Sequence, residues 1–193
     1  MIGLTGGFAV YAGVLIFFHL SEYGLTARYN PQELSVRSLL FSVPYVIALL
    51  FSLTEFWVES YLFPEWKAEN YPCYVLIGLI FVAIGETLRK VAIITAGRAF
   101  SHEIRTEKNA FHQLITTGIY KWIRHPAYLG WFIWAPATQV LLKNPVSFVL
   151  FVLVGWRYFS QRIPFEENIL LSFFGERYEQ YRQKTPTRIP FIP

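Results

Sequence analysis

The sequence of 193 residues contains no aspartate, so all 13 of its acidic residues are glutamates. Charged residues make up only 16% of the chain, whereas soluble domains contain about a quarter. This shortage, together with 54% hydrophobic and 19% aromatic residues, indicates an integral membrane protein. A single cysteine, Cys73, excludes an internal disulfide framework. The first apolar run lacks the basic flank and cleavage site of a removable signal peptide, so we expect it to be a membrane helix.

Five apolar stretches approach the roughly 20 residues that a helix needs to cross a bilayer. They run from about Leu4 to Leu25, Leu39 to Trp57, Cys73 to Ala96, Ala127 to Leu142, and from Pro145 through Trp156. The turn between the last two is only Lys143-Asn144-Pro145, and proline suits the first turn of the next helix. We therefore predict an all-α integral membrane protein with about five transmembrane helices, a cytoplasmic catalytic segment and a C-terminal tail.

The chain reads as one domain, residues 1–193, because no internal repeat or low-complexity linker interrupts it. Its predicted parts are three transmembrane helices in 1–96, a cytoplasmic segment in 97–126, a helical hairpin in 127–160 and a tail in 161–193. Lysine and arginine in short loops mark the cytoplasmic side of a membrane protein. These residues concentrate between Gly97 and Arg124 and in the tail. We therefore expect both segments to face the cytoplasm and the N-terminus to face the other side.

Ionisable residues also occur inside the predicted spans. They share helix faces at spacings of three or four: His19 with Glu22, Glu55 with Glu59, and Glu86 with Arg89, followed by Lys90. A polar cavity and structural pairing between helices both explain such residues. We favour pairing for the first two groups. The pairing interpretation would also have Arg89 and Lys90 snorkel to the cytoplasmic end. Gly78 and Gly85 predict close contact with a neighbouring helix.

A run from Gly118 to Trp131 combines cations, a histidine, a proline and aromatic residues. Pro126 suits the first turn of a helix, so we predict a helix that begins there. Arg124 and His125 would lie at its N-terminal mouth, where unpaired N–H groups favour anions. An anchor at the membrane interface explains the same residues about equally well. The chain's histidines fit no compact zinc pattern, and no metal site is predicted.

The tail holds a second polar group. Arg162 and Glu166 are four residues apart and would share a helix face, where a salt bridge is the simplest interpretation. Pro164 lies between them and predicts a kink that spreads the two side chains along a cavity wall. Residues 170–181 read as an amphipathic interfacial helix, and residues 185–193 as an extended strap folded back on the protein.

An ordered set of motifs runs through nearly the whole chain: Phe18-His19…Ser21-Glu22, Gly85-Glu86…Arg89-Lys90, Thr95-Ala96-Gly97…Phe100-Ser101-His102, His112-Gln113-Leu114-Ile115, Gly118-Ile119-Tyr120, Arg124-His125-Pro126-Ala127-Tyr128, Arg162…Glu166-Glu167 and Pro186…Ile189-Pro190-Phe191. By these motifs the sequence resembles the isoprenylcysteine carboxyl methyltransferase family, which lies in the endoplasmic reticulum membrane and methylates the C-terminal prenylcysteine of CaaX proteins. The Arg-His-Pro…Tyr and Glu-Glu motifs are shared with phospholipid methyltransferases, whereas the Thr-Ala-Gly and Ile-Pro-Phe motifs are narrower. Ala127 and Lys143 replace the family's usual Ser and frequent Cys, and neither change removes an expected catalytic group.

The resemblance implies S-adenosylmethionine as the cofactor and prenylated CaaX proteins, farnesyl or geranylgeranyl, as partners. It implies a multi-pass protein of the endoplasmic reticulum membrane whose active site faces the cytoplasm. Arg162 would hold the substrate carboxylate, and Arg162 and Glu166 form the implied catalytic pair. The implied cofactor contacts are Arg105, His112, Gln113, Leu114, Ile115, Tyr120, His125, Pro126, Ala127, Tyr128 and Glu166. No nucleic acid partner is expected.

The chemistry agrees with this implication. A carboxylate is already ionised at neutral pH, so its methylation needs orientation and loss of water, and no general base. An arginine such as Arg162 can grip a carboxylate through two parallel N–H bonds, and the rings of Tyr120 and Tyr128 can attract a sulfonium cation. Two other hypotheses stay open. A phospholipid N-methyltransferase would be expected to carry a carboxylate base in place of Arg162, and a non-catalytic scaffold or small transporter would be expected to place its polar residues near the midplane.

Overall fold

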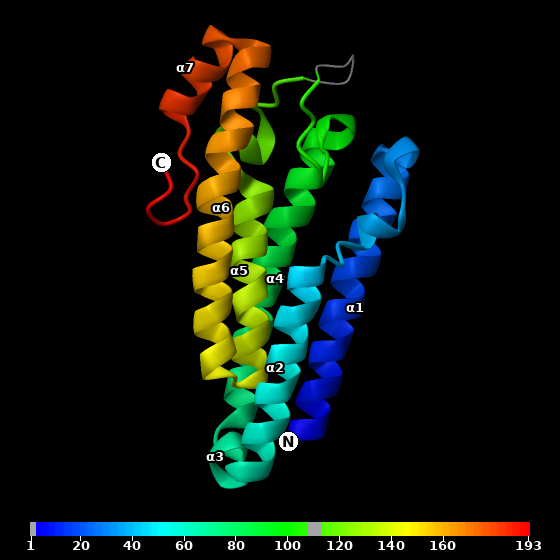
Figure 1. Cartoon of the computed structure of the whole chain (residues 1–193), viewed down its shortest axis with the longest axis vertical. Coiled ribbons are helices and arrows are strands. Elements are labelled where there is room, and N and C mark those ends of the chain that lie inside the picture. The colour runs from blue at the N-terminus through cyan, green and yellow to red at the C-terminus, as the bar shows by residue number, and fades with distance from the viewer. Residues whose placement is uncertain (1–2, 108–112) are drawn as a thin grey trace.

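The computed structural model describes residues 3–107 and 113–193, and these residues form helices and loops without a β-strand. The predicted all-α fold is therefore confirmed. Five long helices stand side by side in one bundle (Figure 1). They are α1 (Leu4–Tyr29), α2 (Val43–Leu62), α4 (Tyr71–Ala96), α5 (Pro126–Leu142) and α6 (Pro145–Phe174). The short elements are η1 (Pro31–Glu33), η2 (Val36–Leu39), α3 (Pro64–Ala68), η3 (Gly97–Ala99), η4 (Gly118–Lys121) and α7 (Glu176–Lys184).

The five long helices match the five predicted apolar stretches, with shifted ends. The second helix begins at Val43 instead of Leu39, because the chain first makes the turn η2 and Leu40 takes a left-handed backbone with φ 62°. Ser42 then caps α2 by accepting a hydrogen bond from the Tyr45 backbone N–H. The predicted start of α5 at Pro126 is confirmed, and Lys143, with φ 54°, closes the tight turn into α6.

The tail differs from the prediction. Helix α6 continues through Pro164 to Phe174, and Pro164 lies on its exposed face. The predicted kink at this residue stays a prediction. The predicted interfacial helix over residues 170–181 is wrong, because Gly175 ends α6 with φ 55° and α7 starts after it. Glycine tolerates this backbone conformation, so the chain can change direction at that residue.

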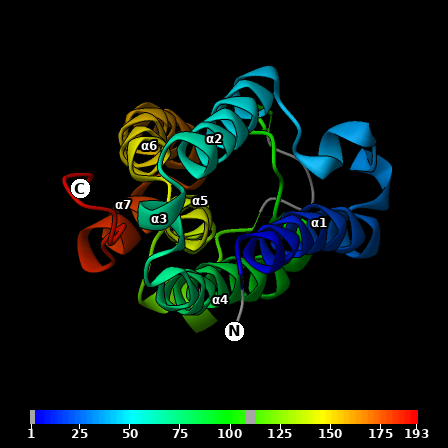
Figure 2. The same cartoon turned by 90° about the horizontal axis from the view of Figure 1, so that it is seen from below.

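Close packing of α4 against α5 forms the centre of the bundle, and the end-on view shows α5 between α4 and α6 (Figure 2). A Cβ atom added to Gly85 would lie 2.6 Å from the Gly130 carbonyl oxygen and 2.7 Å from the Trp134 backbone nitrogen. A Cβ atom on Gly78 would lie 2.6 Å from the backbone nitrogen of Leu141. The close helix contact predicted from both glycines is thus confirmed.

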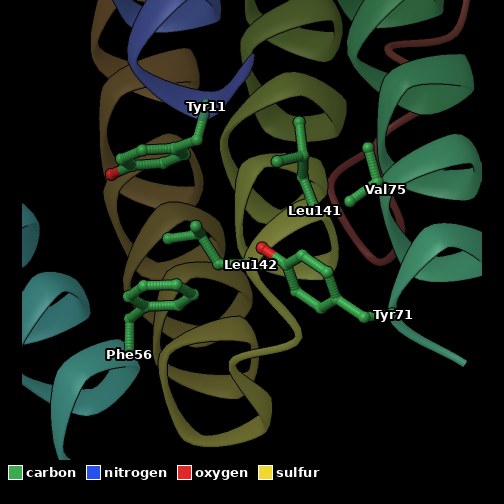
Figure 3. Close-up of a cluster of buried hydrophobic side chains, with 6 residues drawn as sticks. All are labelled: Tyr11, Phe56, Tyr71, Val75, Leu141 and Leu142. Carbon is green, nitrogen blue, oxygen red and sulfur yellow. The ribbon is translucent and has the colours of Figure 1, made fainter. Parts of the chain in front are cut away.

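A hydrophobic cluster joins four helices near the end of the bundle where the N-terminus and α3 lie (Figures 1 and 3). Its buried members are Tyr11 from α1, Phe56 from α2, Tyr71 and Val75 from α4, and Leu141 and Leu142 from α5. All of them are nearly inaccessible to solvent. This cluster fixes the four helices relative to one another.

Structural pairing explains the glutamates of α2. The Glu55 carboxylate accepts hydrogen bonds from the backbone N–H groups of Val146 (2.8 Å) and Ser147 (2.6 Å), and so caps the start of α6. Glu59 accepts a bond of 2.6 Å from the Lys67 ammonium, which is buried in α3. Our preference for interhelical pairing is confirmed at both positions.

The same holds for α1. The His19 ring bonds the Leu39 carbonyl at 2.6 Å, and the Glu22 carboxylate accepts two hydrogen bonds from the Arg89 guanidinium at 2.8 and 2.9 Å. Lys90 also pairs with Glu22. Arg89 and Lys90 do not snorkel away from the bundle, because the Glu22 carboxylate on the neighbouring helix faces both cations inside it.

The outward faces of the long helices carry large apolar side chains, as lipid-facing surfaces do. Examples are Ile16, Phe17 and Leu20 on α1, Ile47 and Leu50 on α2, Leu76 and Ile80 on α4, and Leu153 and Val154 on α6. Two stretches, Leu4–Tyr29 and Val36–Leu62, meet both the length and the hydropathy of a membrane span. The count of about five spans remains a prediction.

Candidate active site

Most of the predicted site residues lie at the end of the bundle opposite α3 (Figure 1). Here α5 begins, the second half of α6 passes beside it, and the segments 97–107 and 113–125 cover the helix ends. Proline at the first position of α5 starts the helix and places His125 at its N-cap and Tyr128 in its first turn. The site is therefore built on a helix start next to a continuous helix.

The phenol of Tyr128 joins the two predicted catalytic residues. Its hydroxyl donates a hydrogen bond to the Glu166 carboxylate and accepts one of 2.8 Å from the Arg162 Nε. Arg162 and Glu166 thus meet through a tyrosine, and not through the direct salt bridge that their spacing suggested. Both side chains come from one face of α6, so one phenol can contact both of them.

Neutral oxygen atoms hold the Arg162 guanidinium. Besides Tyr128, it donates to the Tyr158 hydroxyl at 3.0 Å and to the His102 backbone carbonyl at 2.7 Å. Its cationic carbon also lies 5.4 Å from the centre of the Tyr128 ring. Within residues 3–107 and 113–193, no carboxylate lies within 4.0 Å of this guanidinium. Arg162 is consequently oriented while its charge stays available to an anion.

His125 is fixed from two sides. Its Nε2 lies 2.9 Å from the Glu167 carboxylate, and its ring stacks on the Tyr128 ring with 5.4 Å between centres and 5° between planes. Glu167 also accepts a hydrogen bond from the buried Arg124. The sequence placed Arg124 at the mouth of α5 but assigned it no partner, and it assigned Glu167 no role. Their position beside predicted site residues in the motifs was the only local signal.

Arg105 lies where the segment 97–107 meets the loop after α1. It pairs with the Glu33 carboxylate, which also accepts a hydrogen bond of 3.1 Å from the Ser101 hydroxyl. Two other nitrogens of the Arg105 guanidinium, Nε and Nη1, are buried and have no hydrogen-bond partner among the residues that the structure describes. Buried donors of this kind require an acceptor, so they fit a polar ligand such as a nucleoside cofactor.

The other predicted cofactor residues are distributed around this end of the bundle. Gln113 is exposed, Leu114 and Ile115 are half-buried, and all three lie in an irregular segment before η4. Tyr120 is half-buried in η4, and its carbonyl accepts a hydrogen bond of 2.7 Å from the Tyr181 hydroxyl of α7. Pro126 and Ala127 are buried in the first turn of α5. His112 lies outside the residues that the structure describes.

A second layer of residues, absent from the predicted site, supports this end of the bundle. Arg89 donates to the Ala127 carbonyl at 3.2 Å while it pairs with Glu22, so it connects α1, α4 and α5. The His102 Nε2 lies 3.2 Å from the Thr26 hydroxyl, which places the His102 carbonyl where Arg162 reaches it. No group of three or more histidine, cysteine or acidic residues with metal-binding geometry occurs in the described part of the chain.

The arrangement can bind an anion between an oriented arginine and a wall of aromatic rings. Of the two predicted acid–base groups that the structure describes here, His125 contacts Glu167 and Glu166 accepts a hydrogen bond from Tyr128, so neither stands alone as a base. Such a site suits a nucleophile that is already ionised.

A model of the isoprenylcysteine carboxyl methyltransferase family matches residues 76–172. These residues include α5 and the group of Tyr128, Arg162 and Glu166, here called the Tyr128 hub. The chain belongs to this family. The protein-S-isoprenylcysteine O-methyltransferase of Xenopus laevis is 48% identical over 187 residues, which cover 96% of this chain and 64% of the frog protein. The probable protein-S-isoprenylcysteine O-methyltransferase of Oryza sativa subsp. indica is 48% identical over 184 residues, with 95% of both chains covered. The chain thus spans about two thirds of the animal methyltransferase and nearly all of the plant one.

A solved structure of the eukaryotic intramembrane Ras methyltransferase, isoprenylcysteine carboxyl methyltransferase, has the same fold. Its TM-score is 0.93 at 42% sequence identity, and the match covers 98% of this chain and 68% of that one. The likeness to an intramembrane enzyme of this family shows that the apolar bundle is that of a membrane protein.

Proposed function

We propose that this chain transfers a methyl group from S-adenosylmethionine to the C-terminal carboxylate of a prenylcysteine and forms a methyl ester. The observation that carries the proposal is the state of Arg162, whose guanidinium is oriented by three oxygen atoms and forms no direct ion pair with a carboxylate among the described residues. A cation held this way at the edge of a membrane bundle suits one anionic group on a lipid-modified peptide. The similar proteins bear the name of the same reaction.

In this mechanism Arg162 binds and orients the substrate carboxylate. When bound, S-adenosylmethionine would supply an electrophilic sulfonium methyl group for in-line displacement. The unpaired donors of Arg105 would hold a polar part of the cofactor, and Glu166 would accept hydrogen bonds from its amino or ribose groups. The rings of Tyr120 and Tyr128 would face its positive charge. Further contacts would come from His112, Gln113, Leu114, Ile115, His125, Pro126 and Ala127.

The proposal includes the placement of the chain in the membrane. About five helices would cross the membrane of the endoplasmic reticulum, with segment 97–126 and the tail on the cytoplasmic side. The prenyl group, farnesyl or geranylgeranyl, would enter between the helices from the bilayer. Water would be excluded around the carboxylate, which raises its reactivity once it is bound.

The first experiment measures transfer of labelled methyl from S-adenosylmethionine to N-acetyl-farnesylcysteine by the purified protein in detergent. We expect a base-labile methyl ester. Methylation of phosphatidylethanolamine instead would identify a phospholipid N-methyltransferase. Absence of both products and of cofactor binding would contradict an enzymatic role and favour a scaffold or transporter.

Replacing Arg162 tests the carboxylate clamp. Loss of a charge-assisted bidentate contact of about 3 kcal/mol corresponds to roughly a hundredfold, so Arg162→Ala should lower kcat/KM for the prenylcysteine by about that factor. Binding of S-adenosylhomocysteine, measured by calorimetry, should change little. Arg157→Ala is the matched control, because Arg157 is exposed on the same helix. Unchanged turnover by Arg162→Ala would refute the clamp.

A further inference from the structure

The C-terminal segment Thr185–Pro193, here called the strap, is held by one buried arginine. Arg124 is only 5% exposed. Its guanidinium donates hydrogen bonds to the backbone carbonyls of Thr185 and Pro193, and its backbone N–H donates to the Pro186 carbonyl at 2.9 Å. A third guanidinium bond of 3.2 Å reaches the Arg182 carbonyl at the end of α7. Arg124 therefore contacts both ends of the strap.

The strap has an ordered shape of its own. The Thr187 hydroxyl donates to the Ile192 carbonyl and accepts from the Ile189 backbone N–H at 3.3 Å, which closes a turn. Ile189 and Ile192 are buried in a cluster with Phe159 and Ile163 of α6. These contacts keep the strap against the second half of α6, on the helix that carries Arg162.

A continuous series of contacts leads from the strap to the site. The Arg124 Nε donates to Glu167, and the same carboxylate oxygen lies 2.9 Å from the His125 Nε2. His125 stacks on Tyr128, whose hydroxyl binds both Arg162 and Glu166. A shift of Arg124 would thus release Glu167 and the His125 ring, and these two residues connect Arg124 to Tyr128.

Arginine is suited to this position for a physical reason. A buried cation is costly unless its hydrogen bonds are satisfied, and only the guanidinium has five donors in a fixed plane. Three carbonyl groups and one carboxylate accept hydrogen bonds from four of the five donors of Arg124. A lysine ammonium at the end of a flexible stem could not reach all four acceptors in these directions.

We propose that Arg124 and the strap are positioning elements that set His125 and Tyr128 before the cofactor binds. Through Glu167, Arg124 holds His125 in one orientation, so the cofactor side of the site is formed in advance. The strap supplies the carbonyl groups that keep Arg124 there. This inference rests on the proposed function, and it assigns no direct contact with substrate to Arg124.

The test compares Arg124→Lys with the matched variant Arg188→Lys, which makes the same change on the exposed part of the strap. Loss of one or two charge-assisted bonds should raise the Kd of S-adenosylhomocysteine, measured by calorimetry, by about tenfold. The KM for the methyl donor should rise equally, while kcat at saturating donor stays within about twofold. Arg188→Lys should leave all three values unchanged. A purely structural role would instead lower the melting temperature and the active fraction without changing the Kd.

Thr187→Val provides a second variant that touches neither Arg124 nor His125. It removes the hydroxyl that closes the turn of the strap and preserves the side-chain shape, so we expect the Kd to rise by about threefold. An unchanged Kd in this variant would overturn the role of the strap, and an unchanged Kd in Arg124→Lys would overturn that of Arg124. Calorimetry on the wild type separates the two proposals, because cofactor binding without ester formation would contradict only the proposed substrate.

Discussion

The half-buried residue His102 holds the loop over the site. Its ring packs between α1 and α4, where Nε2 lies 3.2 Å from the Thr26 hydroxyl, while its carbonyl accepts a bond from Arg162. Burial, and next the positive charge of Arg89, lower the pKa of His102 to about 4. The ring is therefore neutral at pH 7, and its contact with Glu22 at 3.5 Å is not an ion pair there.

A pH dependence of stability follows at this residue. The pKa of His102 is about 4 in the folded chain and 6.5 in the unfolded one. Between these values the unfolded chain binds a proton that the folded chain does not, so stability falls as the pH drops from 6.5 to 4. Above pH 6.5 the contribution is constant. The melting temperature of His102→Gln should therefore fall less between pH 7 and pH 5 than that of the wild type. Equal falls in both proteins would show that His102 does not titrate in this way.

Helices α4 and α5 approach each other closely, and this approach sets the position of the α5 start. Gly85 and Gly130 face each other across the contact, and Arg89 on the same face of α4 reaches the Ala127 carbonyl. Separating these helices would move Tyr128 away from α6 as well as weaken packing. Two small residues thus determine both the rigidity of the bundle and the geometry of the site.

Gly85→Ala tests this contact. Its new Cβ would lie 2.6 Å from the Gly130 carbonyl oxygen, and overpacking of this kind costs about 1–3 kcal/mol. The melting temperature and the rate of ester formation should both fall. Gly13→Ala on α1 is the control, since nothing lies within 4 Å of its Cβ and alanine favours a helix by about 1 kcal/mol. A Gly85→Ala protein as stable as the control would contradict the role of the close contact.

The two ends of the bundle differ in what they carry. The hydrophobic cluster of Tyr11 and Leu141 lies toward α3 (Figures 1 and 3), whereas the contacts of Tyr128 with Arg162 and Glu166 lie toward α7 (Figure 1). Basic loops accompany the second end, which predicts that it faces the cytoplasm. Cys73, exposed in the first helical turns of α4, belongs to the first end.

This orientation can be measured because the chain has a single cysteine. In sealed microsomes whose cytoplasmic face is outward, a membrane-impermeant maleimide should leave Cys73 unlabelled until detergent is added. A Glu107→Cys, Cys73→Ser variant should be labelled at once, since Glu107 is exposed in the segment after α4. The reverse pattern of labelling would invert the proposed topology.

Local sequence patterns specify the helices of this protein. Long apolar runs require helices, and Pro126 and Pro145 begin α5 and α6. Gly85 indicates a closely packed neighbouring helix. These properties depend on residues near one another in the chain. The spacing of Arg162 and Glu166 in the sequence did not predict that the Tyr128 hydroxyl would bind both of them, because Tyr128 comes from another helix.

The partners of the buried charged residues follow only from the packing of the folded chain. Glu22 meets Arg89 across 67 residues, and Arg124 meets Glu167 across 43. Helical periodicity tells which residues share a face, but it does not tell which faces of two helices meet or at what height. That choice follows from the packing of α4 and α5 and from the strap, so only the folded bundle pairs each buried charge with its partner.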